Sequence, residues 1–220
     1  MILMQPALVV FDLDGTLIDS APDMHRAVNR MLGDLGCEPL SLREVRSMVG
    51  DGASALIARA LAARQCVTAD PAKALAVFLE HYEEEPTAFT KTYPDVQETL
   101  ARLRAHGLML ALCTNKPGRL TQMILERLEI EQYFVRVIAG DSLPFRKPDP
   151  RALLAVLTGF DTHTAATIMV GDSEVDAATA HAAAVPFVLM TYGYHRGPID
   201  GISSIATLDH FHELATLLHA

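Results

Sequence analysis

Residues 7–17 read ALVVFDLDGTL, a short apolar run that leads directly into two carboxylates. The run has the length and the β-branched content of a strand that is covered on both faces. In an open α/β sheet, the ligand crevice lies at the carboxyl ends of the strands. We therefore expect Asp12 and Asp14 at the mouth of such a sheet. Gly15 permits a sharp turn there, and Thr16 can orient a neighbouring carboxylate.

The close spacing of Asp12 and Asp14 indicates a bound cation. Two carboxylates so near each other repel unless they share a cation or a proton. Magnesium takes hard oxygen ligands, usually one or two carboxylates together with waters and substrate phosphate. The alternative is an acidic turn after a strand, which is common for one aspartate and rarer for this pattern.

Bulk properties exclude several classes of protein. The chain has 220 residues, of which half are apolar, and its formal net charge is −9. This length suits one domain with a large insertion or two small domains. The negative charge argues against nucleic-acid binding as a main role. No apolar run approaches the roughly 20 residues of a membrane span, so we expect no membrane association.

The N-terminal segment and the cysteines indicate a cytoplasmic protein. Residues 1–6 lack the basic segment and cleavage site of a signal peptide. Cys37, Cys66 and Cys113 are odd in number and far apart, with neither a Cys-x-x-Cys pair nor zinc-like spacing. We therefore expect a reduced setting.

The chain has two regions with different hydrophobic patterns. Helical periodicity dominates residues 22–89, where Ser41 and Glu44 form an expected capping box. From residue 93, expected helices alternate with apolar strands at 108–113, 135–139, 167–170 and 187–190. We expect His210 and His212 in the terminal helix. Repeated β-α-β units imply a doubly wound parallel sheet. We expect an α/β core domain from residues 1–20 and 90–220, with an inserted helical domain at 21–89.

Three further strand ends or loops carry polar residues: Thr114 and Asn115, then Lys147, then Asp172 with Asp176. Together with Asp12 they suit phosphoryl transfer, in which catalysis is mostly positioning and charge stabilisation. At about 4 Å and an effective dielectric near 20, each like-charge pair costs on the order of 4 kcal/mol, so cations are required. We expect magnesium between the aspartates and Lys147 opposite it. Thr114 and the amide of Asn115 would bind the phosphoryl oxygens.

The order of DxDGTL at 12–17, TNK at 114–116, KPDP at 147–150 and GDSxxD at 171–176 resembles the haloacid dehalogenase superfamily, in its phosphatase branch. The resemblance implies that Asp12 is the nucleophile, which forms an aspartyl-phosphate, and that Asp14 is the general acid and base. It also implies that the Asp12 carboxylate, the Asp14 backbone carbonyl and the Asp172 side chain bind Mg²⁺, with Asp176 beside these ligands.

Within the superfamily, the inserted helices resemble the helical cap of the phosphoglycolate phosphatase-like group, and so do the segments 49–53, 140–144 and 191–194. The resemblance implies hydrolysis of 2-phosphoglycolate to glycolate and phosphate. A cap of this kind needs a contact for the substrate carboxylate, and Arg46 is the candidate, although it is equally well read as a solvated side chain. Ala184 departs from the pattern, because relatives usually carry glycine there.

Other functions stay open on sequence grounds. A phosphatase or mutase for another small phosphate ester, such as a sugar phosphate, would share all the core motifs. A non-catalytic binding module with the same fold is a further alternative, although the intact acids and lysine count against it. The GDSL at 140–143 matches a serine esterase signature by accident. We expect a small phosphorylated metabolite as partner, and the resemblance implies a monomer or a homodimer.

Overall fold

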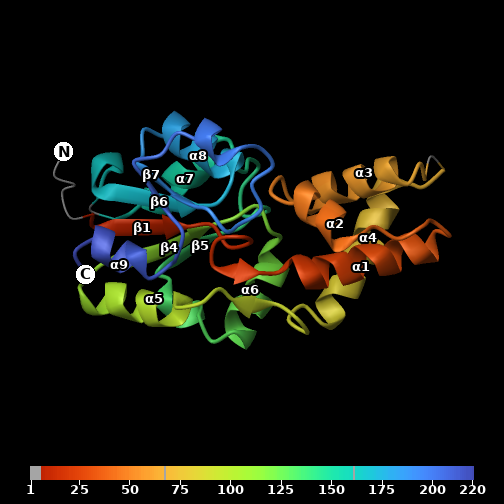
Figure 1. Ribbon diagram of the computed structural model, residues 1–220, viewed down its shortest axis with the longest axis horizontal. Coiled ribbons are helices and arrows are strands. Elements are labelled where there is room, and N and C mark those ends of the chain that lie inside the picture. The colour runs from red at the N-terminus through yellow and green to blue at the C-terminus, as the bar shows by residue number, and fades with distance from the viewer. Residues whose placement is uncertain (1–5, 67, 161) are drawn as a thin grey trace.

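The computed structural model describes residues 6–66, 68–160 and 162–220. Within these ranges, six strands form one parallel sheet in the order β5-β4-β1-β6-β7-β8 (Figure 1). The strands are β1 (Leu8–Phe11), β4 (Met109–Cys113), β5 (Arg136–Ile138), β6 (Thr167–Gly171), β7 (Phe187–Met190) and β8 (Ala206–Leu208). The predicted doubly wound parallel sheet is confirmed, and β8 is an additional short strand at its edge.

The central strand β1 is buried on both faces, which explains its continuous apolar run. Val10 lies between Ala111 of β4 and Met169 of β6. Val9 and Phe11 belong to one apolar cluster and Val10 to another, because successive side chains point to opposite faces. The first cluster includes side chains of α5 (Val96–Ala105), α6 (Gly118–Arg127) and α9 (Glu213–Leu217). The second includes side chains of α7 (Pro150–Leu157) and α8 (Glu174–Ala182).

A group of four helices lies beyond one end of the sheet (Figure 1), namely α1 (Ala21–Asp34), α2 (Leu42–Met48), α3 (Ala53–Ala63) and α4 (Pro71–Glu84). The predicted capping box of Ser41 and Glu44 opens α2. Two short antiparallel strands, β2 (Ile18–Asp19) and β3 (Lys91–Thr92), pair where the chain enters and leaves this group. Strands of two residues carry no periodicity, so the sequence pattern does not predict them.

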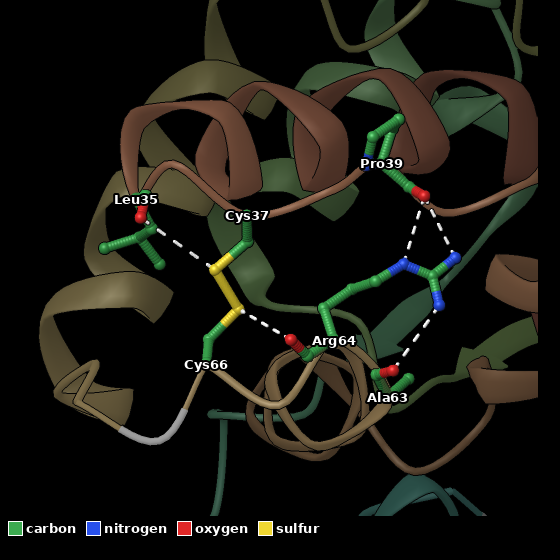
Figure 2. The surroundings of a disulfide bond; sticks show 6 residues. All are labelled: Leu35, Cys37, Pro39, Ala63, Arg64 and Cys66. Carbon is green, nitrogen blue, oxygen red and sulfur yellow. Dashed lines mark hydrogen bonds between the residues drawn. A yellow bond between two sulfur atoms is a disulfide. The ribbon is translucent and has the colours of Figure 1, made fainter.

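The helical group contains a disulfide bond between Cys37 and Cys66, whose Cα atoms are 6.5 Å apart (Figure 2). The expectation of a reduced setting, drawn from wide cysteine spacing, does not anticipate this pair. The two cysteines follow the ends of α1 and α3, and the packing of these helices brings together residues 29 positions apart. Arg64 lies beside the bond and donates to the carbonyl of Pro39 at 2.9 and 3.1 Å. Cys113 is a buried free thiol.

The terminal helix begins later than expected. Glu213 accepts hydrogen bonds from the backbone N–H groups of Asp209 and His210, and α9 starts only at Glu213. His210 and His212 therefore precede the helix, and their rings stack with centroids 5.5 Å apart. This corrects the expectation that both lie in the helix.

Three short 3-10 helices complete the described elements: η1 (Glu131–Tyr133), η2 (Thr164–Ala166) and η3 (Ile199–Gly201). None of the described helices combines the length and apolar character that crossing a membrane requires. Residues 1–5, on which the signal-peptide expectation rests, lie outside the described residues.

Candidate active site

The predicted site residues meet at the carboxyl end of the sheet. β1 pairs with β4 on one side and β6 on the other, so successive crossovers run in opposite directions from β1. Such a switch point opens a crevice for ligands. Asp12 follows β1, Thr114 follows β4 and Asp172 follows β6, which places all three at this crevice.

Three buried carboxylates form the floor of the crevice. Asp12, Asp172 and Asp176 each offer an oxygen, and these oxygens lie within 4.8 Å of one another. The Nζ of Lys147 is 2.8 Å from Asp12 Oδ1 and 2.6 Å from Asp176 Oδ1. One ammonium therefore pairs with two of the three acids, and the cluster keeps an excess of negative charge that a cation could balance.

The pKa values reflect this crowding. Burial raises the pKa of Asp12 to about 7, with Lys147 opposing and Asp176 reinforcing the rise. Burial and the two neighbouring aspartates raise the pKa of Asp172 well above its usual value. Burial lowers the pKa of Lys147, but Asp12 and Asp176 outweigh that effect and raise it, so the amine is charged.

Asp172 is held by residues far away in sequence. Thr16 Oγ1 donates to Asp172 Oδ1 at 2.7 Å, so the hydroxyl does orient a carboxylate, one from another strand end. The backbone N–H of Tyr194 donates to Asp172 Oδ2 at 2.6 Å. A Cβ atom at Gly15 or Gly193 would lie within 2.3 Å of Asp172 side-chain atoms, so both positions require glycine. Gly15 also has a φ of +92°, which suits glycine.

Asp176 has both oxygens engaged within the protein. Its Oδ2 accepts from Ser173 Oγ at 2.6 Å and from the Ser173 backbone at 3.2 Å, which forms a capping box at the start of α8. Its Oδ1 faces Lys147. Both oxygens of Asp176 therefore have partners within the protein.

Asp14 contacts a lysine to which the sequence pattern assigned no role. Lys116 Nζ is 2.9 and 3.2 Å from the two Asp14 oxygens and 2.8 Å from the Tyr82 hydroxyl of α4. Burial lowers the pKa of Lys116, but Asp14 and Tyr82 outweigh it and raise the pKa, so the amine is charged. Ser20 Oγ also donates to Asp14.

Asn115 links the sheet to the helical group. Its side-chain Nδ2 donates to the carbonyls of Gly50 and Lys147, both at 2.9 Å. Gly50 lies between α2 and α3, so this amide joins the two parts of the chain. Thr114 Oγ1 accepts from the Lys116 backbone at 3.2 Å and faces the same crevice.

A cavity of about 40 Å³ lies between these strand ends and the helical group. The sheet side contributes Asp12, Asp14, Thr114, Asn115 and Lys116. The helical side is mainly apolar, and its lining side chains include Met24, Val49, Leu56, Phe78 and Tyr82.

The chain matches the family described as haloacid dehalogenase-like hydrolase over residues 9–190. It belongs to that family. A phosphoglycolate phosphatase from Cereibacter sphaeroides is 45% identical over 213 residues, which cover 96% of each chain. One from Pseudomonas putida is 46% identical over 93% of this chain and 76% of the relative. A crystal structure of a predicted phosphoglycolate phosphatase from Haemophilus somnus has a TM-score of 0.93 at 34% identity, covering 98% and 99% of the two chains.

With such relatives over nearly its whole length, this haloacid dehalogenase-like hydrolase is a phosphatase. The structure brings together the predicted residues of the strand ends, namely Asp12, Asp14, Thr114, Asn115, Lys147, Asp172 and Asp176. Arg46 is the exception, because it pairs with Asp19 at 2.5 Å and is absent from the described lining of the cavity. Lys116 and Tyr82 line the cavity instead. The only sequence signal for Lys116 was its place in TNK after a strand.

Proposed function

We propose that this phosphatase hydrolyses 2-phosphoglycolate with Mg²⁺ through an aspartyl-phosphate on Asp12. The observation that carries the proposal is the cluster of Asp12, Asp172 and Asp176 around Lys147 at the end of the sheet. The relatives, which are named phosphoglycolate phosphatase at 45% and 46% identity, support the choice of substrate.

The donor set fits magnesium. Asp12 and Asp172 supply hard carboxylate oxygens, and the Asp14 backbone carbonyl is a further oxygen ligand. Two or three negative charges faced by one lysine are well matched to a divalent ion. Gly15 and Gly193 leave room for Asp172 to approach. When bound, the ion would screen the negative charges of the nucleophile and the phosphoryl group.

The residues supply the chemistry as follows. An Asp12 oxygen attacks phosphorus, the bond from phosphorus to the glycolate oxygen breaks, and Asp14 donates its proton to that oxygen. Asp14 then takes a proton from a water molecule, which attacks the aspartyl-phosphate and releases phosphate and the Asp12 carboxylate. Lys147 and Thr114 hold the phosphoryl oxygens. The side-chain amide of Asn115 donates to the carbonyls of Gly50 and Lys147, so Asn115 would hold a phosphoryl oxygen through its backbone N–H.

Residues 21–89 serve as a cap domain on the core of residues 1–20 and 90–220. The cavity between them is small and has an apolar cap side, which suits exclusion of water during transfer. A small phosphorylated metabolite is the expected partner.

Phosphate release from 2-phosphoglycolate tests the function. We expect turnover with Mg²⁺, loss of turnover in excess EDTA, and recovery when Mg²⁺ is restored. Asp12→Asn should fold normally by circular dichroism and retain less than about one per cent of the activity, because the nucleophile is gone. Full activity in EDTA would contradict the metal. A panel with hexose phosphates and pyrophosphate tests the substrate, and a clear preference for either would contradict 2-phosphoglycolate.

A further inference from the structure

Lys116 combines three properties that its motif does not explain. It is 5% exposed, it lines the cavity, and its amine is shared between Asp14 of the core and Tyr82 of α4. Among the described residues that line the cavity, it is the only cation. The Tyr82 ring also lies under the amine, with its centroid 4.7 Å from Nζ. These partners fix the position of a positive charge at the wall of the cavity.

The position of the leaving group follows from the proposed function, on which this inference rests. If Asp12 attacks phosphorus and Asp14 protonates the departing oxygen, the rest of the leaving group lies beyond Asp14. Lys116 Nζ lies within 3.2 Å of both Asp14 oxygens. The carboxylate of 2-phosphoglycolate is separated from the departing oxygen by a single carbon. The amine is therefore within reach of that carboxylate.

We propose that Lys116 binds the substrate carboxylate and so selects a small leaving group with a negative charge next to the ester bond. Without this cation, a substrate carboxylate would lie beside Asp14 with no positive charge next to it and be repelled. The opposite wall, formed by Met24, Val49, Leu56 and Phe78, offers no side-chain partner to sugar hydroxyls. Hydroxyls buried there would stay unpaired, so the same cavity disfavours hexose phosphates. Tyr82 brings the cap into this recognition through its hydroxyl.

The test compares 2-phosphoglycolate with 2-hydroxyethyl phosphate, which has the same chain length and an uncharged hydroxymethyl group in place of the carboxylate. We expect the wild type to prefer 2-phosphoglycolate in kcat/KM. Lys116→Met should lower the ratio of the two kcat/KM values about tenfold to hundredfold, the effect of losing a hydrogen bond to a charged group. Lys116→Arg keeps the charge and should keep part of the ratio. Arg46→Ala, which removes the other candidate cation, should keep the ratio of the wild type.

The outcomes separate this inference from the proposed function. If the wild type hydrolyses 2-phosphoglycolate but Lys116→Met lowers both kcat/KM values equally, Lys116 only orients Asp14 and the inference is overturned. Loss of the ratio in Arg46→Ala alone would also overturn it. Equal kcat/KM for both substrates in the wild type overturns it without any variant, which covers the case in which Lys116→Met fails to fold. A wild type that turns over other monoesters but not 2-phosphoglycolate overturns the proposed function itself.

Discussion

Asp14 lies between two hydrogen-bond donors, the Ser20 hydroxyl and the Lys116 amine, and it faces the cavity. A general acid matters only when the departing oxygen needs a proton. We therefore expect Asp14→Asn to lower kcat on 2-phosphoglycolate by about 10²- to 10⁴-fold. On p-nitrophenyl phosphate, whose leaving group departs without a proton, the loss should be much smaller. Steady-state kinetics on both substrates measure the difference.

Ser20→Ala is the matched control for Asp14→Asn, because it removes a neighbouring hydrogen bond and leaves the acid in place. It should affect both substrates to a similar, smaller extent. Equal large losses on both substrates in Asp14→Asn would show that the side chain serves another purpose, such as binding the metal.

For individual residues, the sequence predicts membership of the site where a polar side chain follows a strand, as at Asp12, Asp14 and Asp172. It did not identify residues whose role depends on a partner far away. Lys116 matters because Tyr82 of another part of the chain reaches it, and Tyr194 matters through its backbone N–H on Asp172. Neither contact has a local pattern. The local signals for Arg46 are its charge and its place on an expected cap helix just before Gly50, and they do not reveal its pairing with Asp19.

Ala184 lies at a helix end where the resemblance to the family leads to the expectation of glycine. It follows α8 with a φ of +54°, in the left-handed region that disfavours a Cβ. Ala184→Gly should raise the free energy of unfolding by about 1 kcal/mol, because the strain exceeds the added entropy of glycine in the unfolded chain. Urea denaturation measures this change.

The neighbouring Ala183→Gly provides a control, since Ala183 has an ordinary φ of −86°. There, glycine adds flexibility and removes a buried methyl group from the second apolar cluster, so the variant should be less stable than the wild type. A stability gain in both variants, or in neither, would mean that the backbone at Ala184 is not the cause.

Elements with strong patterns were predictable. β1 has a continuous apolar run, α2 has its capping box, and Asp149 caps α7 directly before Pro150. The short strands β2, β3 and β8 could not be predicted, because their sequences carry no clear pattern and their pairing depends on the packing around them. The Cys37–Cys66 pair was hidden for a related reason, because only the packing of α1 against α3 brings the two cysteines together.

Several polar contacts join the helical group to the part of the chain that carries the sheet. Asn115 donates to the Gly50 carbonyl, and Lys116 meets Tyr82. A third contact comes from the loop after β7, where Arg196 is 2.6 Å from both Asp51 Oδ2 and the Val49 carbonyl. The same loop supplies the Tyr194 N–H that holds Asp172. The segment from Tyr194 to Arg196 therefore contacts both the helical group and the acidic cluster.

Arg196 is the contact best suited to testing closure, because it lies outside the described cavity lining. Arg196→Ala should favour an open arrangement and lower kcat/KM for 2-phosphoglycolate about fivefold, the size expected for a partly exposed charge pair worth about 1 kcal/mol. Small-angle X-ray scattering should show a larger radius of gyration. Arg151→Ala is the matched control, because it removes an arginine whose partner Asp149 lies two residues away and outside the helical group. If both variants behave alike, or if the Arg196 variant matches the wild type in kinetics and size, Arg196 does not hold the cap closed.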